Sequence, residues 1–200
     1  MKMKLSEAFY QRENVVQIAQ ELLGKSIHTM VSGEYTSAII TEVEAYSGLN
    51  DKACHANNGV RTARTEVMYA KGGHAYVYLC YGIHHLFNIV TNENDRADAV
   101  LVRAVQPLEG IDIMLKRRGK NKLDKTLTSG PGTLSQALGI KTKTHYGKWL
   151  LDSDIWLEDS RELSSNEIIT STRIGVDYAE EDALKPWRFY IKDNQWISKK

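Results

Sequence analysis

Two strand-like runs separated by a single tight turn occupy residues 72–91, GGHAYVYLCYGIHHLFNIVT. Residues alternate cleanly along 75–80, which is the pattern of a half-buried strand, and residues 85–90 form a second strand-like run. Only Tyr81 and Gly82, with their immediate neighbours, separate the two runs, and so short a separation is typical of a β-hairpin. We therefore expect the chain to build its core around an antiparallel sheet.

The other elements are predicted by the same kind of periodicity. Further strands are expected at Ile27–Met30, at Ser37–Glu44, at Ala99–Val105 and in the tail, where Trp187, Phe189 and Ile191 share one face. Helices are expected over Asn14–Leu23, from Pro107 to Gly119, and from about Thr133 after a Gly-Pro-Gly turn. Strands dominate and no linker tract interrupts them. We predict one α+β domain over residues 1–200, with a curved antiparallel β-sheet flanked by helices and a protruding β-hairpin.

The composition is that of a globular protein. Hydrophobic residues make up 42% and charged residues 26% of the chain. The formal net charge is only +1, so any surface that binds a polyanion must be local. The two cysteines form no C-x-x-C pair, and no apolar run reaches the length of a signal peptide or a membrane span. We expect a cytoplasmic protein with no membrane partner.

The stretch ITEVEAYSG, residues 40–48, places two carboxylates on one strand. Glu42 and Glu44 are two positions apart, so their side chains project from the same face, roughly 7 Å from each other. Taken alone, this pattern is typical of a solvated strand face. Tyr46 and Gly48 follow at once, and the pattern alone does not explain why a strand with two acids ends in an aromatic ring.

Tyr81 breaks the alternation of the first hairpin strand and belongs to the turn. A tyrosine beside a glycine at a hairpin tip projects into solvent unless the tip folds back on the core. An exposed ring at such a place would serve as a wedge or a stacking platform for a partner. The residues alone leave both alternatives open.

Basic residues cluster in two places. Residues 116–125, KRRGKNKLDK, contain six Lys or Arg and one Asp, and the long polar loop 47–66 carries Arg61 and Arg64. Combined with an aromatic tip, such clusters are expected on a surface that binds duplex nucleic acid. A charge run is equally often a solvated face, and this alternative also stays open.

No metal ion or cofactor is expected. His84 and His85 are adjacent and would point to opposite sides of a strand, and His55 and His74 lie in no H-E-x-x-H motif. The chain also lacks the glycine-rich phosphate loop of nucleotide-binding proteins and the G-x-S-x-G motif of serine hydrolases.

Four stretches, in this order and spacing, resemble the alkyladenine (3-methyladenine) DNA glycosylases of base-excision repair: EVEAYSGLNDKACH, YVYLCYGIHHLFNIVT, VLVRAVQPLEG and TSGPGTLSQALGI. The resemblance runs from about Leu5 to Ser198, nearly the whole chain. The N-terminal extension of vertebrate members is missing, so the chain resembles a compact bacterial-type member, associated with the nucleoid through DNA.

The resemblance implies roles for the charged residues. Glu44 matches the catalytic acid that activates water. Arg103 matches an arginine close to the catalytic centre and the target nucleotide, where it could hold Glu44 ionised or contact a phosphate. Glu42 we assign to the structure, either as a hydrogen-bonding partner of the site or as a surface acid.

It also implies how the damaged base is held. Tyr46, His55 and Tyr78 match residues that stack on or touch a base flipped out of the duplex. Asn88 matches the residue at the pocket floor that screens out normal purines. Tyr81 matches the tyrosine that enters the minor groove and fills the vacated place, with Arg61 and Arg64 as further DNA-binding candidates.

The implied reaction is hydrolysis of the N-glycosidic bond of alkylated or deaminated purines in double-stranded DNA: 3-methyladenine, 7-methylguanine, hypoxanthine and ethenoadenine. No lysine stands in the motif as a Schiff-base nucleophile, so a monofunctional enzyme is expected, acting as a monomer. Two alternatives come from the residues. One is a carbohydrate glycosidase that uses Glu42 and Glu44 as an acid/base pair, and the other is a non-catalytic DNA-binding module. Release of free purine from alkylated duplex DNA would distinguish the DNA glycosylase from both of these alternatives.

Overall fold

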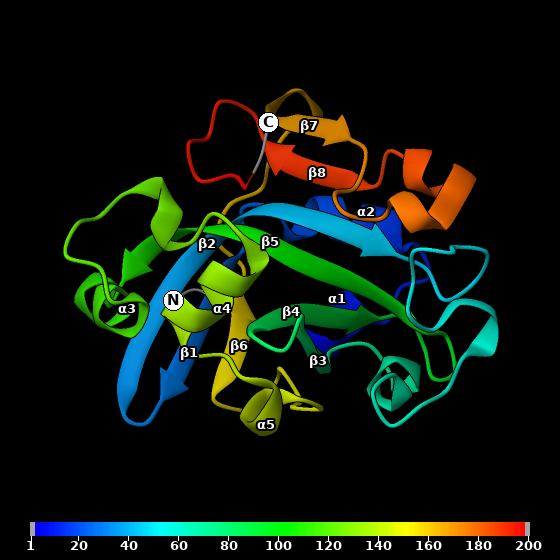
Figure 1. Cartoon of the computed structure of the whole chain (residues 1–200), viewed down its shortest axis with the longest axis horizontal. Coiled ribbons are helices and arrows are strands. Elements are labelled where there is room, and N and C mark those ends of the chain that lie inside the picture. The colour runs from blue at the N-terminus through cyan, green and yellow to red at the C-terminus, as the bar shows by residue number, and fades with distance from the viewer. Residues whose placement is uncertain (1–2, 199–200) are drawn as a thin grey trace.

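The computed structural model describes residues 3–198 and is built around one antiparallel sheet of eight strands (Figure 1). The strands run in the order β3-β4-β5-β2-β1-β6, while β8 pairs with β2 and β7 pairs with β8. Their bounds are β1 Ser26–Val31, β2 Glu34–Tyr46, β3 Ala75–Cys80, β4 His84–Thr91, β5 Asp98–Glu109, β6 Ile155–Glu158, β7 Ile168–Ser171 and β8 Arg188–Ile191.

Short helices surround the sheet, and the predicted α+β fold with a curved antiparallel sheet is confirmed (Figure 1). The α-helices are α1 Glu7–Tyr10, α2 Val15–Leu22, α3 Ile111–Arg118, α4 Pro131–Leu138 and α5 Thr142–His145. The 3-10 segments are η1 Asn57–Gly59, η2 Glu66–Tyr69, η3 Lys125–Leu127, η4 Ser165–Glu167 and η5 Asp177–Leu184. The side chain of Asn14 accepts a hydrogen bond from the backbone N–H of Gln17 and so caps α2 where the sequence predicts its start.

The long strand β2 changes partner along its length. Its first half pairs with β1 over residues 34–39, and its second half pairs with β8 over residues 42–44, with β5 on the other side of both halves. The β2–β5 register shifts twice where β2 changes partner, around Glu42. The sheet therefore branches at the position of the two predicted carboxylates.

The two faces of the sheet have different partners. Alternation along β3 sends Ala75 and Val77 into the main hydrophobic core, which the helices cover. The same alternation sends Tyr76 and Tyr78 to the other face, where they join a smaller cluster with Tyr46. One side of the sheet is thus packed for stability and the other is lined with rings.

Three sequence predictions need correction. Pro107 does not open a helix: β5 continues through it to Glu109, and α3 starts only after Gly110. A proline is tolerated there because β4 pairs with β5 only up to Leu101, so no neighbouring strand on that side needs its missing N–H. Helix α4 begins at Pro131, not at Thr133, since proline suits the first helical position. The four-residue strands β6 and β7 were not predicted.

Gly110 provides a test of this chain path. Its φ of 71° is left-handed, and a Cβ there would lie 2.3 Å from the carbonyl oxygen of Tyr35. Gly33 has a similar φ of +75° but no atom within 4 Å of a Cβ position.

Gly33→Ala should therefore cost only the conformational strain, about 1–2 kcal/mol. Gly110→Ala should cost at least about 1 kcal/mol more, because the backbone must shift. Urea denaturation of both variants measures the difference, and equal losses would contradict the close approach.

Candidate active site

The two carboxylates lie beside a β-bulge. Adjacent residues Glu42 and Val43 of β2 face residues of β5 that are two positions apart, so Arg103 between them has no partner across the strands. Bulges of this kind redirect a side chain and often occur near functional sites. Here the guanidinium of Arg103 lies between Glu42 and Glu44 and donates a hydrogen bond to each.

Glu44 has no exposed surface and accepts three hydrogen bonds. Its Oε2 accepts one from the hydroxyl of Tyr46 at 2.7 Å and one from Nη1 of Arg103 at 3.1 Å. Its Oε1 accepts one from the backbone N–H of Ile174 at 2.8 Å. All three partners are donors, which is the arrangement that suits an ionised carboxylate.

Glu42 is equally buried, so of its two predicted roles the surface acid is wrong and the partner within the site is correct. Its Oε1 accepts hydrogen bonds from Nε of Arg103 at 3.1 Å and from Nε of Arg188 at 2.8 Å. The backbone N–H and the hydroxyl of Ser198 donate to the same carboxylate. Burial alone lowers the pKa of Arg103, but Glu44 and Glu42 outweigh it and raise that pKa above its ordinary value, so the guanidinium stays charged.

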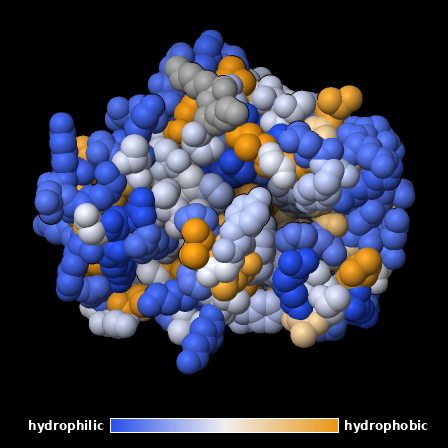
Figure 2. Space-filling model, viewed as in Figure 1, coloured by the Kyte–Doolittle hydropathy of each residue, from blue (hydrophilic) through white to orange (hydrophobic). Residues whose placement is uncertain are grey.

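An aromatic cavity of about 390 Å³ opens in front of this acid network. The rings of Tyr76 and Tyr78 stack with centroids 5.4 Å apart, and the His55 ring meets Tyr78 edge-on at 4.7 Å. Tyr46, Arg103 and Ile174, the three residues that hold Glu44, also line the cavity. Figure 2 shows this face of the molecule hollowed near its centre, between the hairpin with α4 below and the C-terminal strands above.

His55 is neutral at ordinary pH. Burial lowers its pKa from 6.5 to about 4, with a smaller contribution from the positive charge of Arg64. Its Nδ1 lies 2.8 Å from the hydroxyl of Tyr76, and this contact fixes the ring at the cavity wall. A neutral imidazole can accept or donate a hydrogen bond to a ligand without repelling a positively charged one.

Asn88 is held rigidly on β4 within the cavity lining. It is buried, and its amide nitrogen donates to the backbone carbonyls of Tyr76 at 3.1 Å and Leu86 at 3.3 Å. Because both bonds tie it to the hairpin backbone, its side chain is not free to swing away from an incoming group.

The hairpin tip is exposed and apolar, which decides between the two alternatives for Tyr81. Tyr81 is 92% exposed with a φ of 50°, and Ile83 beside it is 71% exposed. The tip is supported from below, because His84 lies so close to Gly132 at the start of α4 that a Cβ there would be 2.8 Å from its Nδ1. A rigid hairpin therefore presents an unpacked ring at the mouth of the cavity, which Tyr81 also lines.

The two predicted loop arginines have different surroundings. Arg61 is ion-paired with Asp95 at 2.8 Å, and its guanidinium lies 4.1 Å from the ring centroid of Tyr69. It does not line the aromatic cavity. Arg64 is exposed, and its charge reaches the cavity, where it contributes to the lowered pKa of His55.

The basic run 116–125 is partly used within the fold. Lys116 and Arg117 both contact Glu34, and Arg118 donates to the backbone carbonyl of Leu127. These bonds tie α3 to β2 and η3. The run lies with α3 at the left edge of Figure 1, away from the hairpin near the centre.

Sequence reasoning missed Arg173, which holds the cavity walls together. Its guanidinium forms two bonds to the carboxylate of Asp51, at 2.6 and 2.7 Å, and also donates to the carbonyls of Ala45 and Asp182. It stacks 4.8 Å from the ring centroid of Tyr46. A lone arginine in the pattern STRIG carries no signal for this, because its partners come from distant segments.

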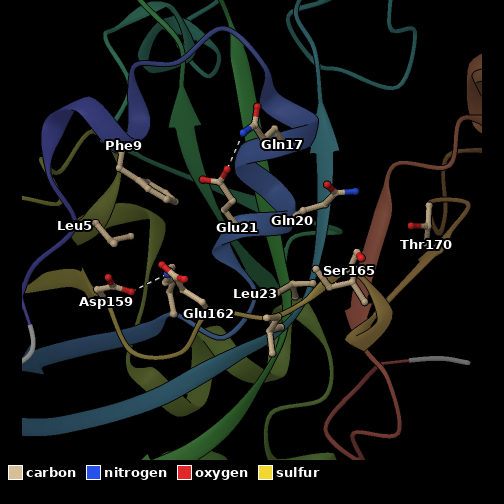
Figure 3. Close-up of a pocket in the computed structure, with 13 residues that line it drawn as sticks. Leu5, Phe9, Gln17, Gln20, Glu21, Leu23, Asp159, Glu162, Ser165 and Thr170 are labelled. Carbon is tan, nitrogen blue, oxygen red and sulfur yellow. Dashed lines mark hydrogen bonds and ion pairs between the residues drawn. The ribbon is translucent and has the colours of Figure 1, made fainter.

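A larger hollow, of about 730 Å³, lies elsewhere, between α2, the N-terminal segment and the segment before β7 (Figure 3). Most of its charged groups are paired: Lys25 binds Asp159 at 2.7 Å, and Glu21 binds Arg12 at 2.6 Å and accepts a hydrogen bond from Gln17. Glu162 also lines it, and Phe9 is the one aromatic ring among the described residues of its lining. We therefore take the smaller, ring-lined cavity as the candidate active site.

Within residues 3–198, no three His, Cys, Asp or Glu side chains lie together as metal ligands do. In the same part of the chain, no helix combines the length and the apolar character needed to cross a bilayer.

The protein thus has an α+β fold in which a buried carboxylate, hydrogen-bonded to an arginine, lies beside an aromatic cavity. The chain matches the model of the methylpurine-DNA glycosylase family over residues 8–195, and it belongs to that family. It is 43% identical over 98% of its length to a protein of Natranaerobius thermophilus and 45% identical over 99% to one of Alkaliphilus oremlandii, covering 99% and 100% of those chains. A protein of Chlamydia felis is 46% identical over 94% of this chain and 95% of its own. Each of the three is named "Putative 3-methyladenine DNA glycosylase".

The lowered pKa of His55 predicts a pH dependence of stability. Between about pH 6.5 and 4 the unfolded chain binds a proton at His55 and the folded chain does not, so acidification through this window destabilises the fold. His55→Asn removes this contribution and should lose less stability than the wild type between pH 7 and pH 4.5. Chemical denaturation at both pH values measures the two losses. Equal losses would show that His55 titrates alike in both states.

Proposed function

We propose that this protein hydrolyses the N-glycosidic bond of damaged purines flipped out of duplex DNA. Its substrates in this proposal are 3-methyladenine, 7-methylguanine, hypoxanthine and ethenoadenine. The protein acts as a monomer and releases the free base without cleaving the strand. No lysine is among the described residues that line the cavity, so a Schiff-base route has no nucleophile there and direct attack by water is favoured.

The observation that carries this proposal is the position of Glu44. A carboxylate has about four accepting positions, and the described residues occupy three of them. Glu44 lies behind the cavity wall, in contact with the lining residues Tyr46, Arg103 and Ile174. In this proposal its remaining position takes a proton from a water molecule at that wall. That water attacks C1′ of the sugar, the C1′–N bond breaks, and its electron pair leaves with the base. A cationic alkylated purine thereby leaves neutral, and a neutral purine such as hypoxanthine leaves as an anion that takes up a proton from solvent.

Arg103 donates hydrogen bonds to Glu42, Glu44 and Ser198. These bonds favour the role in which Arg103 holds Glu44 over the role in which it contacts a phosphate.

The cavity suits an electron-poor purine. Stacked tyrosine rings attract a cationic or electron-deficient base, and neutral His55 adds no repulsion. Such a pocket accepts most purines, because every base has a π-face. Selection must therefore come from exclusion, and in this proposal Asn88, whose amide is held by two hydrogen bonds, obstructs the 2-amino group that distinguishes guanine from hypoxanthine.

The surface around the cavity suits a duplex with one nucleotide removed from the stack. Tyr81 can enter the gap that a flipped base leaves, and its rigid hairpin avoids the cost of ordering a flexible wedge. In this proposal Arg64, which is exposed and whose charge acts on His55, contacts a phosphate of the duplex. Arg61 is also a DNA-contact candidate, although it must first leave Asp95.

The two rival functions fit the geometry less well. A carbohydrate glycosidase needs two carboxyl groups that flank a substrate, whereas the carboxylate of Glu42 is enclosed by donors from Arg103, Arg188 and Ser198. A binding module without chemistry has no need of a buried acid network beside its pocket, since burying charges costs stability.

Glu44→Gln tests the chemical assignment. The amide keeps the shape of the side chain but removes the base, so excision should fall about 100-fold or more. Affinity for the damaged duplex should stay near that of the wild type. Release of free hypoxanthine and 3-methyladenine in single turnover, beside a binding titration, measures both quantities. Glu66→Gln, at an exposed acid outside the cavity, is the control. Retention of near-wild-type excision by Glu44→Gln would exclude Glu44 as the base.

Tyr81→Ser tests the wedge. Because the ring is 92% exposed, the variant should unfold within about 0.5 kcal/mol of the wild type. Loss of base stacking, about 1–3 kcal/mol, should weaken binding to damaged duplex by about five-fold or more. Leu184→Ser, at another exposed apolar residue outside the cavity, should change neither quantity. Unchanged affinity of Tyr81→Ser would remove the ring from the DNA interface.

A further inference from the structure

We propose that Glu42 and Ser198 are positioning residues for base excision, and that the C-terminal segment completes the active site by closing on Arg103. This inference rests on the proposed function, since it concerns the efficiency of the same acid, Glu44. Neither residue lines the aromatic cavity, so each would act through the guanidinium.

The guanidinium of Arg103 is held at two ends. Its Nε donates to Glu42 at 3.1 Å, and its Nη1 donates to Glu44 at 3.1 Å. Two contacts restrict how this planar group can turn, and a third, from Nη2 to the hydroxyl of Ser198, restricts it further. Glu42 thereby determines where the charge of Arg103 lies relative to the catalytic carboxylate.

Ser198 closes this arrangement from the far end of the chain. Its backbone N–H donates to Oε2 of Glu42 at 2.5 Å, and its hydroxyl donates to Oε1 at 2.8 Å. The same hydroxyl accepts a hydrogen bond from Nη2 of Arg103 at 3.3 Å. One small side chain therefore contacts both the acid and the base of the buried pair, and it is 156 positions from Glu42 in the sequence.

The charges alternate along the network. Arg188 donates to Glu42, Glu42 accepts from Arg103, and Arg103 donates to Glu44. Two acids and two arginines balance, so the network adds no net charge to the interior. Without Glu42 and Ser198, Arg103 would be free to turn fully onto Glu44 and occupy the accepting position that the water needs.

A matched set of variants tests this role. Ser198→Ala removes the hydroxyl that joins Glu42 to Arg103, and it should lower the single-turnover excision rate about ten-fold. The dissociation constant for damaged duplex should stay within about two-fold of the wild type, because no cavity contact is lost. Ser198→Thr keeps a hydroxyl and should recover most of the rate.

Thr41→Val is the control for a loosened tail. The Thr41 hydroxyl donates to the carbonyl of Trp196 at 2.5 Å and anchors the same segment to β2 without touching Arg103. This variant should keep the wild-type rate. A rate for Ser198→Ala within two-fold of the wild type, or an equal loss in Thr41→Val, would overturn the proposal.

A double-mutant cycle tests whether Ser198 acts through Arg103. Arg103→Lys cannot bridge two carboxylates as a guanidinium does, so adding Ser198→Ala to it should have little further effect on the rate. An undiminished ten-fold effect in that background would contradict the proposed route. If the wild type itself released no purine from hypoxanthine- or 3-methyladenine-containing duplex, the proposed function would fail as well. Normal excision by the wild type with normal excision by Ser198→Ala would sink only this inference.

Discussion

One buried guanidinium, that of Arg103, connects the sheet with its chemistry. It lies at a bulge of β5, where β2 exchanges β1 for β8, and it separates two acids that would otherwise repel each other inside the protein. Removing one member of a buried ion pair typically costs about 3–5 kcal/mol, because the remaining charge has no partner. The branch in the sheet, the closing C-terminal segment and the buried state of Glu44 all depend on this one group.

The cavity depends on a second arginine. Arg173 joins the end of β2, the loop that contains Asp51 and the segment η5, and its guanidinium supports the ring of Tyr46 from behind. Its neighbour Ile174 supplies a backbone donor to Glu44. The cavity walls and the buried carboxylate of Glu44 are therefore joined in one hydrogen-bonded assembly, which is the preorganisation that the proposed catalysis requires.

The parts of the fold that could be predicted are those whose sequence patterns lie within a few neighbouring residues. The hairpin was predicted correctly because alternation over six residues reports directly on strand structure. Pro107 was assigned to a helix because proline favours helix starts, and its place in β5 is explained by the absence of a paired strand on the β4 side at this position. Strands β6 and β7 have four residues each, too few for a period to emerge, and they form because β1 and β8 offer them free edges.

The candidate site also has a part that the sequence predicts and a part that it does not. The candidate residues Glu44, Tyr78 and Arg103 could be named from the sequence, because the motifs around them are contiguous and specific. Whether Tyr81 projects or folds back, and whether Glu42 is a surface acid, could not be decided there, since exposure depends on what packs nearby. Arg173, Arg188 and Ser198 gave no signal at all, because a hydrogen bond between residues more than a hundred positions apart has no trace in local pattern. The sequence by itself determined the strand pattern and the chemical groups; the tertiary structure decided which of them meet, because only folding brings β2, β5, β8 and the C-terminal segment around one guanidinium.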